Sequence, residues 1–192
     1  MKKILTLFQR NYDGDRLVRN EVTPGCEWVL AGAGEASEKI DGTCCMIRDS
    51  KLYKRYELKK GKVAPRDFEA AQEPDPVTGD VPGWVRVTDG SEDQWHREGY
   101  DWRLEFFGTT LVDGTYELIG PKIQQNPYNM GIHQLVEHGV ISVLRGYTIN
   151  FDVLRDYLYD HEIEGIVWRD HDGKMAKLKR RDFGFTWPVK HR

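Results

Sequence analysis

The sequence lacks most of the features that identify a protein class at first sight. Its only cysteines are Cys26, Cys44 and Cys45, two of them adjacent and none in a CxxC spacing. That pattern matches neither a disulfide framework nor a zinc motif, and it favours a reducing, cytoplasmic compartment. No apolar run approaches membrane-spanning length, and the one near the start is too short for a signal peptide. We therefore expect no membrane association.

Several motifs for nucleotides and metals are also missing. There is no GxxxxGK[ST], so any use of ATP does not go through a P-loop, and there is no HExxH. Gly32–Ser37 lacks the third glycine of a dinucleotide fingerprint. His133 and His138 are five residues apart, which would put them on different faces of a helix. The histidines are therefore expected to be ordinary surface or core residues rather than metal ligands.

The sequence has little net charge, but its basic residues are concentrated at one end. The net charge is −3, yet the stretch from Lys174 to Arg192 holds seven Lys or Arg and a single acid, Asp182. A basic end on a mildly acidic chain predicts a partner that carries phosphate.

Most of the sequence consists of short strand-like runs separated by Asp-Gly dipeptides, which are typical of turns. We predict one α+β domain over residues 1–192, with mainly antiparallel sheet. Two helices are expected, at 132–138 and at 150–159, the second with Asn150 as its N-cap. Residues 72–101 are rich in proline, glycine and acids, which predicts a long surface excursion or a lid. Besides a first strand within the opening residues, strands are expected at 26–31, 43–48, 51–56, 83–87, 115–119, 165–169 and 175–179.

Lys39 lies in SEKIDGTCC, beside a tight turn and at the edge of a strand-like run. A free lysine has a pKa near 10.4, so using it as a nucleophile at pH 7 costs roughly 4 to 5 kcal/mol. Nearby cations and desolvation reduce that cost. Lys177 and Lys179 are two apart in a strand-like run, so they share a face. Both amines could therefore reach the same site, lower the pKa of Lys39 and neutralise phosphates.

Two acids and an arginine complete the pattern. Glu164 precedes the apolar pair of EGIVWR, where a carboxylate is placed like a metal ligand. Glu117 in TYELIG could accept hydrogen bonds from a ribose hydroxyl. Arg55 lies on the strand that the turn at residues 49–51 pairs with the run after Lys39, and it could hold ribose or phosphate oxygens. Each feature alone is common by chance, so their order in the chain carries the argument.

That order, KxDG, KR, ExxG, EGIV and KxK, resembles the covalent nucleotidyltransferase superfamily of DNA ligases, RNA ligases and mRNA capping enzymes. Longer stretches, including EKIDGTCC, YELIGPKIQQNPY and KLKRRDFG, are similar to the ATP-dependent RNA ligase family known from vertebrates as the 5′–3′ RNA ligase. The chain looks like a minimal-length version, viral or bacterial. The resemblance implies a nucleotidyltransferase (adenylation) domain of antiparallel sheets with flanking helices, without an OB-fold domain.

The resemblance also assigns roles to residues. It implies that Lys39 attacks ATP to form lysyl-AMP, that AMP passes to an RNA 5′-phosphate, and that a 3′-hydroxyl then seals the ends, as in RNA repair. It implies that Glu164 binds Mg²⁺ or Mn²⁺. The nucleotide-binding residues would be Glu38 (through its main-chain carbonyl, to the adenine amino group), Asp41, Gly42, Arg55, Glu117, Lys177 and Lys179.

The partner implied is RNA with 5′-phosphate and 3′-hydroxyl ends, with no obligate protein partner. For a viral protein, the compartment would be the host cytosol. Lys122, Gln124 and Asn126 are candidates for the acceptor path, and the basic end could hold the RNA backbone through Arg180, Arg181, Lys190 and Arg192. The aromatic that stacks on the base stays open among Tyr128, Tyr147 and Phe151.

Two alternatives stay open. One is a capping-type guanylyltransferase or a DNA ligase, although both usually carry an OB-fold, for which the residues after Lys179 leave no room. The other is a catalytically silent module that binds nucleotide or RNA.

Overall fold

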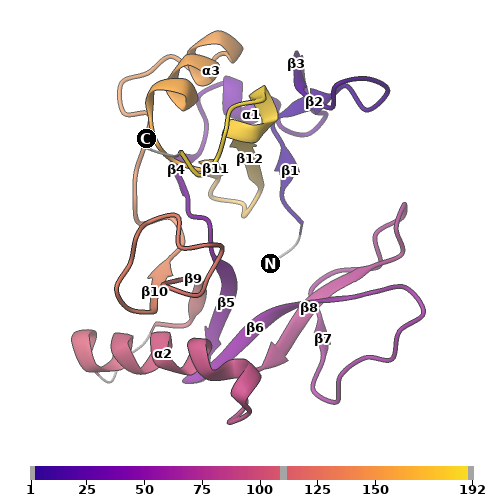
Figure 1. The fold of residues 1–192 in the computed structure, drawn as a ribbon. Coiled ribbons are helices and arrows are strands. Elements are labelled where there is room, and N and C mark those ends of the chain that lie inside the picture. Colours follow the sequence, from indigo (N-terminus) through magenta and orange to yellow (C-terminus); the bar gives the residue numbers. More distant parts are fainter. Residues whose placement is uncertain (1–2, 109–111, 190–192) are drawn as a thin grey trace. The chain divides into compact units, whose positions relative to one another are not determined.

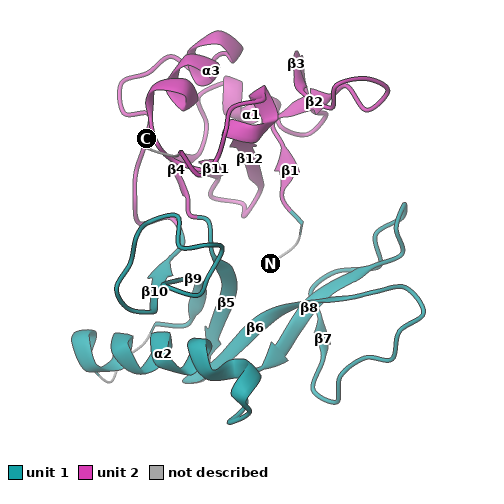
Figure 2. Cartoon of the chain, viewed as in Figure 1, with its two compact units in different colours: residues 1–3, 41–138 teal, residues 4–40, 139–192 magenta. Residues whose placement is uncertain are grey.

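The computed structural model describes residues 3–108 and 112–189, which form two compact units (Figure 2). Unit 1 comprises residues 1–3 and 41–138, and unit 2 comprises residues 4–40 and 139–192. The chain passes from unit 2 into unit 1 between Ile40 and Asp41, inside the KIDG stretch. The prediction of a single domain stays a prediction.

Unit 1 is built on a six-stranded antiparallel sheet with the order β10-β9-β5-β6-β8-β7 (Figure 1). Helix α2 (Gln94–Phe107) packs against one face of it, where Tyr116, Leu118 and Leu135 are buried. Strand side chains alternate between faces, so the residues between these in sequence lie on the opposite face. The strands are β5 (Thr43–Arg48), β6 (Lys51–Leu58), β7 (Glu69–Ala70), β8 (Val81–Arg86), β9 (Gly114–Ile119) and β10 (Gln134–Glu137).

Unit 2 contains a four-stranded sheet with the order β1-β12-β11-β4. β1 runs parallel to β12, and the other pairs are antiparallel. One face of the sheet, with Ile166, Trp168 and Leu178, belongs to the core of the unit, together with Leu154 and Leu158 of α3. The elements are β1 (Leu5–Thr6), β4 (Glu35–Lys39), β11 (Gly165–Arg169), β12 (Met175–Lys179), α1 (Glu27–Leu30), α3 (Phe151–Asp160), the 3₁₀ turn η2 (Arg180–Phe183) and the hairpin of β2 (Phe8–Arg10) with β3 (Val18–Val22).

The α+β class and the mainly antiparallel sheets are confirmed. Three expected elements are wrong. Residues 26–31 contain the helical turn α1 instead of a strand, and residues 132–138 contain strand β10 instead of a helix. Within residues 72–101, the expected strand at 83–87 corresponds to β8 (Val81–Arg86). A short 3₁₀ turn, η1 (Ser91–Asp93), and the start of α2 follow β8. The long surface excursion expected over residues 72–101 is therefore the third wrong element, because much of that segment is regular structure.

Helix α3 follows the sequence signal that predicts it. The Oδ1 atom of Asn150 accepts a hydrogen bond from the backbone N–H of Val153 at 3.0 Å, which confirms Asn150 as the N-cap. Leu154, Tyr157 and Leu158 recur at helical spacing and are buried. No helix within residues 3–108 and 112–189 has the length and apolar character needed to span a membrane.

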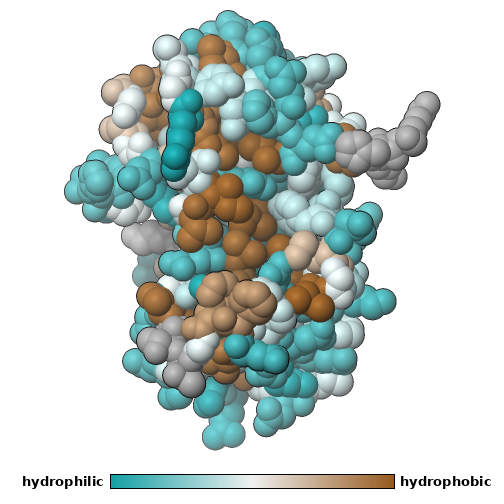
Figure 3. All heavy atoms as spheres, turned by 90° about the vertical axis from the view of Figure 1, so that its left-hand side faces the viewer, coloured by the Kyte–Doolittle hydropathy of each residue, from teal (hydrophilic) through white to brown (hydrophobic). Residues whose placement is uncertain are grey.

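Apolar side chains also reach the surface. Figure 3 shows one face of the molecule, on which hydrophobic residues lie between hydrophilic ones. In unit 1, Phe106 and Phe107 at the end of α2 are among the exposed large side chains. Exposed apolar residues are normal for a folded chain, and these are not by themselves a site.

Candidate active site

Strand pairing in unit 2 brings three lysines to one face of the sheet. Lys39 of β4 and Lys179 of β12 both oppose Gly165 of the central strand β11. Lys177 opposes Val167, two residues farther along the same strand. Residues opposite each other across antiparallel strands share a face, and so do residues two apart. The three amines therefore lie on the face opposite the core residues Ile166 and Leu178.

Gly165 is needed at the centre of this group because the backbone of β12 lies very close. A Cβ atom added to Gly165 would lie 2.3 Å from the carbonyl oxygen of Leu178 and 2.8 Å from the Cα of Lys179. Contacts that short do not occur without a shift of the strand. The glycine also leaves the row between Lys39 and Lys179 without an intervening side chain.

Glu164, immediately before β11, pairs with Lys39. The Nζ atom of Lys39 donates a hydrogen bond to Oε2 of Glu164 at 2.6 Å. The carboxylate side chain is 10% exposed and the lysine side chain 24% exposed, so the pair is largely shielded but still reachable from solvent. The Glu164 carbonyl accepts a hydrogen bond from the N–H of Arg180, which ties the residue to the end of β12. This arrangement couples a carboxylate to an amine inside a cationic cluster.

Lys177 shows the electrostatic cost of the cluster. Its pKa is lowered to about 8, first by burial and then by the positive charges of Lys179 and Lys39. Burial and like charges both disfavour the protonated amine. An anion with several oxygens, such as a phosphate, would remove this penalty. The site is thus preorganised for negative charge.

Two further residues of unit 2 frame the lysines. The backbone N–H of Glu38 donates to the carbonyl of Ile141 at 2.8 Å, and burial raises the pKa of the Glu38 carboxyl. Asp182 is fully buried and accepts a hydrogen bond from the backbone N–H of Lys179 at 2.8 Å. Asp182 also pairs with Arg10. These contacts fix the strand ends that carry Lys39 and Lys179.

In unit 1, Glu117 is tied to the KIDG stretch. Its Oε1 atom accepts a hydrogen bond from the N–H of Gly42 at 3.1 Å, and its Oε2 atom lies 2.8 Å from Nε2 of His138. A Cβ atom at Gly42 would lie 2.2 Å from the carbonyl oxygen of Leu118, so only glycine fits there. The N–H of Asp41 donates to the hydroxyl of Tyr128 at 2.7 Å. Glu117 therefore contacts Gly42 directly, whereas the backbone of Asp41 is held by Tyr128.

Arg55 lies on the same face of the unit 1 sheet as Glu117 and Cys44. Glu117 opposes Cys44 across β9 and β5, and Arg55 on β6 opposes Trp84 of β8. The guanidinium carbon of Arg55 lies 5.2 Å from the Trp84 ring centroid, and burial lowers the pKa of Arg55. Its neighbour Lys54 points to the other face and pairs with buried Asp93. The two residues of the KR motif thus have different surroundings.

The RNA-binding candidates are spread over both units. Lys122 is exposed in unit 1, and Gln124 donates to the carbonyl of Gly42 at 3.2 Å. In unit 2 the guanidinium of Arg180 is buried and donates to the carbonyls of Leu158, Tyr159, His161 and Thr186, whereas exposed Arg181 donates to the carbonyl of Trp187. An RNA role for both arginines stays a prediction. Lys190 and Arg192 lie outside the described residues.

The remaining candidates have distinct packing. Asn126 bonds within its own loop, to the backbone of Met130. Among the candidate aromatics, Phe151 packs against Phe8 and Phe183 in the core of unit 2, and Tyr147 packs edge-on against Tyr157. The hydroxyl of Tyr128 accepts a hydrogen bond from the N–H of Asp41 in the KIDG stretch.

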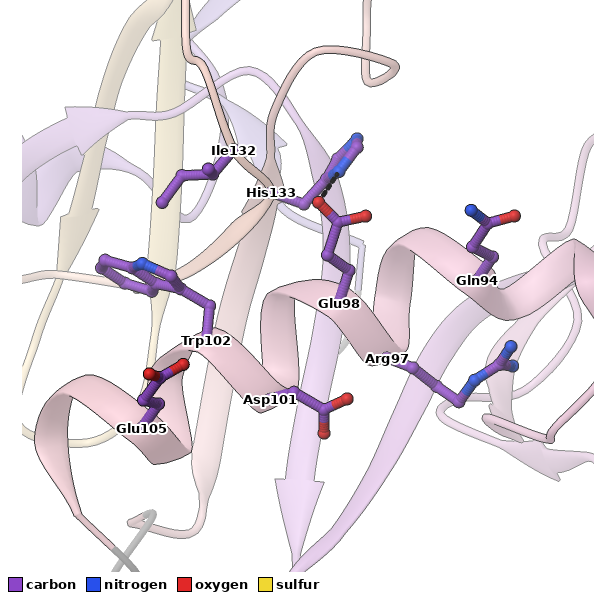
Figure 4. Close-up of a pocket in the computed structure, with 8 residues that line it drawn as sticks. All are labelled: Gln94, Arg97, Glu98, Asp101, Trp102, Glu105, Ile132 and His133. Carbon is purple, nitrogen blue, oxygen red and sulfur yellow. Dashed lines mark ion pairs between the residues drawn. The ribbon is translucent and has the colours of Figure 1, made fainter.

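A surface pocket on α2 contains none of the predicted site residues (Figure 4). Glu98, Asp101 and Glu105 line it, and His133 lies 3.0 Å from Glu98. Its three carboxylates outnumber the one arginine in the lining, Arg97, so the pocket offers a phosphate no excess of positive charge.

The comparisons with known proteins agree with the resemblance seen in the motifs. The family model for RNA ligase 1 matches residues 103–192. RNA ligase 1 from Mus musculus is 29% identical to the chain, and RNA ligase 1 from Danio rerio is 26% identical. Each alignment covers 80% of this chain and 68% of the relative. These matches support an RNA ligase family for the chain.

Proposed function

We propose, from the premise that the chain belongs to an RNA ligase family, that it is an ATP-dependent enzyme that joins RNA 5′-phosphate and 3′-hydroxyl ends through lysyl-AMP on Lys39. The observation that carries the proposal is the group formed by Lys39, Glu164, Lys177 and Lys179 on one face of the unit 2 sheet. A nucleophilic amine, a carboxylate and two further cations are the groups that transfer of a nucleotide to lysine requires.

In the first step the Nζ atom of Lys39, having lost a proton, attacks the α-phosphorus of ATP. A nitrogen–phosphorus bond forms, the bond to the bridging oxygen breaks, and pyrophosphate leaves with the electron pair. Lys177 and Lys179 would stabilise the negative charge on the transferring and leaving phosphates.

A divalent metal fits the donor chemistry beside Lys39. Glu164 offers a carboxylate oxygen, and Mg²⁺ is commonly bound by one or two carboxylates together with phosphate oxygens and waters. When bound, the ion supplies charge neutralisation for the phosphates. Glu164 would hold it, whether Mg²⁺ or Mn²⁺.

Two transfers complete the proposed reaction. An RNA 5′-phosphate oxygen attacks the phosphorus of lysyl-AMP, which returns the amine to Lys39 and gives an AMP-capped 5′ end. A 3′-hydroxyl then loses its proton and attacks the capped phosphate, forming the phosphodiester bond and releasing AMP. Both steps place phosphate charge where Lys177 and Lys179 would neutralise it.

The family resemblance assigns the other nucleotide contacts. The Glu38 carbonyl would accept from the adenine amino group, Glu117 would accept from a ribose hydroxyl, and Arg55 would contact ribose or phosphate. Asp41 and Gly42 would shape the turn after Lys39. The hydrogen bond from Gly42 to Glu117 supports this assignment, because it links the nucleophile's motif to the proposed ribose contact.

The decisive experiment is an intact mass measurement after incubation with ATP and Mg²⁺, followed by removal of free nucleotide. We expect a gain of one AMP that is lost in Lys39→Ala and Lys39→Arg and retained in Lys174→Ala, an exposed lysine just before β12. No gain with either Mg²⁺ or Mn²⁺ would contradict the proposal and favour a silent binding module.

Substrate competition separates the related enzymes. We expect labelling from ATP but not from GTP, and sealing of RNA 5′-phosphate and 3′-hydroxyl ends. Labelling from GTP would indicate a capping-type enzyme. Adenylation with sealing of nicked DNA but not RNA would indicate a DNA ligase.

A further inference from the structure

A cysteine, a glutamate and a histidine meet on the face of the unit 1 sheet that α2 does not cover. One ligand atom from each of Cys44, Glu117 and His138 lies within 4.8 Å of the other two. Cys44 and Glu117 oppose each other across β5 and β9. His138 follows β10, and its backbone N–H donates to the carbonyl of Thr115 at 3.1 Å. Three strand segments that are distant in sequence thus bring three different donor types to one point.

We propose that Cys44, Glu117 and His138 form a binding site for a divalent transition-metal ion of the Zn²⁺ class. Sulfur, imidazole nitrogen and carboxylate oxygen are the ligands that Zn²⁺ takes in proteins, and three protein ligands leave a fourth position for water. Mg²⁺ and Ca²⁺ select oxygen ligands, so a thiol argues against them.

The distances require only small adjustments. Tetrahedral zinc with bonds of about 2.0 to 2.3 Å keeps its ligand atoms roughly 3.3 to 3.8 Å apart. Nε2 of His138 and Oε2 of Glu117 are 2.8 Å apart, so they would separate by about half an ångström. Cys44 and His138 are half-buried, which leaves the group reachable from solvent.

Contacts around the ligands orient them for an ion. Oε1 of Glu117 accepts from the N–H of Gly42, so Oε2 faces His138. Nδ1 of His138 lies 2.9 Å from Oγ1 of Thr115, which fixes the imidazole ring and directs Nε2 toward Glu117. A ligating histidine usually bonds an oxygen through its other nitrogen in this way.

The charge balance also suits a dication. On binding, the Cys44 thiol releases its proton to solvent and coordinates as thiolate, and Nε2 of His138 coordinates without a proton. The thiolate and Glu117 together offset the two charges of the ion. Arg55 lies on the neighbouring strand and the same face, where its positive charge interacts with Cys44.

Glu117 is also the residue to which the proposed function assigns the ribose, so the test measures metal binding without nucleotide. Its outcome is therefore independent of whether Lys39 accepts AMP. The full chain, reduced and stripped of metal, is titrated with Co²⁺ while the absorption of the cobalt–thiolate charge-transfer band is followed. Displacement by Zn²⁺ then gives the zinc affinity.

We expect one Co²⁺ per chain, with a thiolate band that disappears in Cys44→Ser and an affinity that falls at least about tenfold in His138→Asn. Thr115→Val, which removes only the oxygen behind the imidazole, should weaken binding about 10- to 100-fold. Cys45→Ser is the matched control, because Cys45 points to the core face and its Sγ donates to the carbonyl of Thr43. Circular dichroism checks that each variant is folded. A wild-type chain without the band, or a band that persists in Cys44→Ser, would overturn the proposal.

Discussion

Lys39 of β4 and Lys179 of β12 face each other across a single residue of β11, Gly165. No side chain stands between the two amines, and the carboxylate of Glu164 bonds to the first of them. The sheet therefore gathers positive charge in the row of Lys39, Gly165 and Lys179, and the negative charge of Glu164 lies immediately before β11.

Gly165→Ala should separate β12 from β11. The added methyl carbon would lie 2.3 Å from the Leu178 carbonyl oxygen, so the strands must move apart. Overpacking of this kind costs about 1 to 3 kcal/mol of unfolding free energy. Urea denaturation followed by circular dichroism measures the loss. AMP transfer should fall more than stability alone explains, because Lys179 moves with β12.

Gly114→Ala provides the matched control, since a Cβ there meets nothing closer than 3.9 Å. This strand glycine in unit 1 should tolerate the methyl group with little change in stability or AMP transfer. Equal losses in both variants would show that Gly165 has no special role.

Glu164→Gln should change how much metal the reaction needs. A neutral amide oxygen is a weaker ligand for a hard cation than a carboxylate. Changes to the residues around a bound metal typically weaken its affinity about 10- to 100-fold. We therefore expect the Mg²⁺ concentration for half-maximal AMP transfer to rise at least about tenfold. EDTA should abolish transfer in the wild type, and excess Mg²⁺ should restore it.

The control for this change is Glu162→Gln, an exposed carboxylate two residues away. Its metal requirement should match that of the wild type. A Glu164→Gln chain with a lower rate but an unchanged metal requirement would indicate that Glu164 acts on Lys39 alone.

Lys177→Met should make the chain more stable at pH 7 while reducing AMP transfer. The pKa of Lys177 is about 8 in the folded chain, below its ordinary value of 10.5. Below pH 8 the Lys177 amine is charged in both the folded and the unfolded chain. The folded chain then bears the full free-energy cost of holding that charge in a buried, cationic site. Wild-type stability therefore recovers as pH rises from about 8 to 10.5, and the advantage of Lys177→Met disappears over that window. We expect an advantage of about 1 to 3 kcal/mol at pH 7.

Urea denaturation of both chains at pH 7 and pH 10 gives this difference directly. Lys174→Met, at an exposed position before the same strand, should shift stability by less than about 0.5 kcal/mol at either pH. A loss of stability in Lys177→Met at pH 7 would mean that the amine is favourably paired in the folded chain.

Local sequence signals predicted most strands but failed where tertiary pairing decided. The apolar spacing of Ile132, Leu135 and Val136 suits a helix, yet pairing with β9 makes Gln134–Glu137 a strand. The sequence does not predict helix α2, because Gly99 and many charged residues obscure the helical spacing of its apolar residues. A Cβ at Gly99 would lie 2.6 Å from a methyl carbon of Leu118, so that side chain would have to shift to accept a larger residue.

The sequence likewise predicts only part of the candidate site. The spacing of Lys177 and Lys179 predicts that they share a face, and strand pairing confirms that Lys39 shares it too. Nothing in the sequence links Cys44 to His138, because their proximity arises only from the pairing of β5 with β9 and of β9 with β10. The apolar spacing that favours a helix at 132–138 also gives no sign that His138 follows a strand paired with β9.

Lys54→Met should be the most destabilising lysine change in unit 1. Lys54 pairs with Asp93, a fully buried carboxylate that also accepts from the backbone and hydroxyl of Thr88 at 2.8 and 3.0 Å. Burial opposes the charge of Asp93, but the hydrogen bonds from Lys54 and Thr88 outweigh it and lower the pKa of Asp93. Removing the cation leaves a buried charge without its partner, which costs about 3 to 5 kcal/mol.

The pH dependence identifies the cause of that loss. Because the folded pKa of Asp93 is lowered, the pair stabilises the wild type above the ordinary carboxyl pKa near 3.9 and loses this contribution as pH falls. The gap between wild type and Lys54→Met in urea denaturation should therefore narrow on acidification. Asp93→Asn in the Lys54→Met background should recover part of the loss at pH 7, and Lys51→Met, exposed on the same strand, should have little effect. If the gap were independent of pH and Asp93→Asn recovered nothing, lost packing of the Lys54 stem would explain the cost instead of the ion pair.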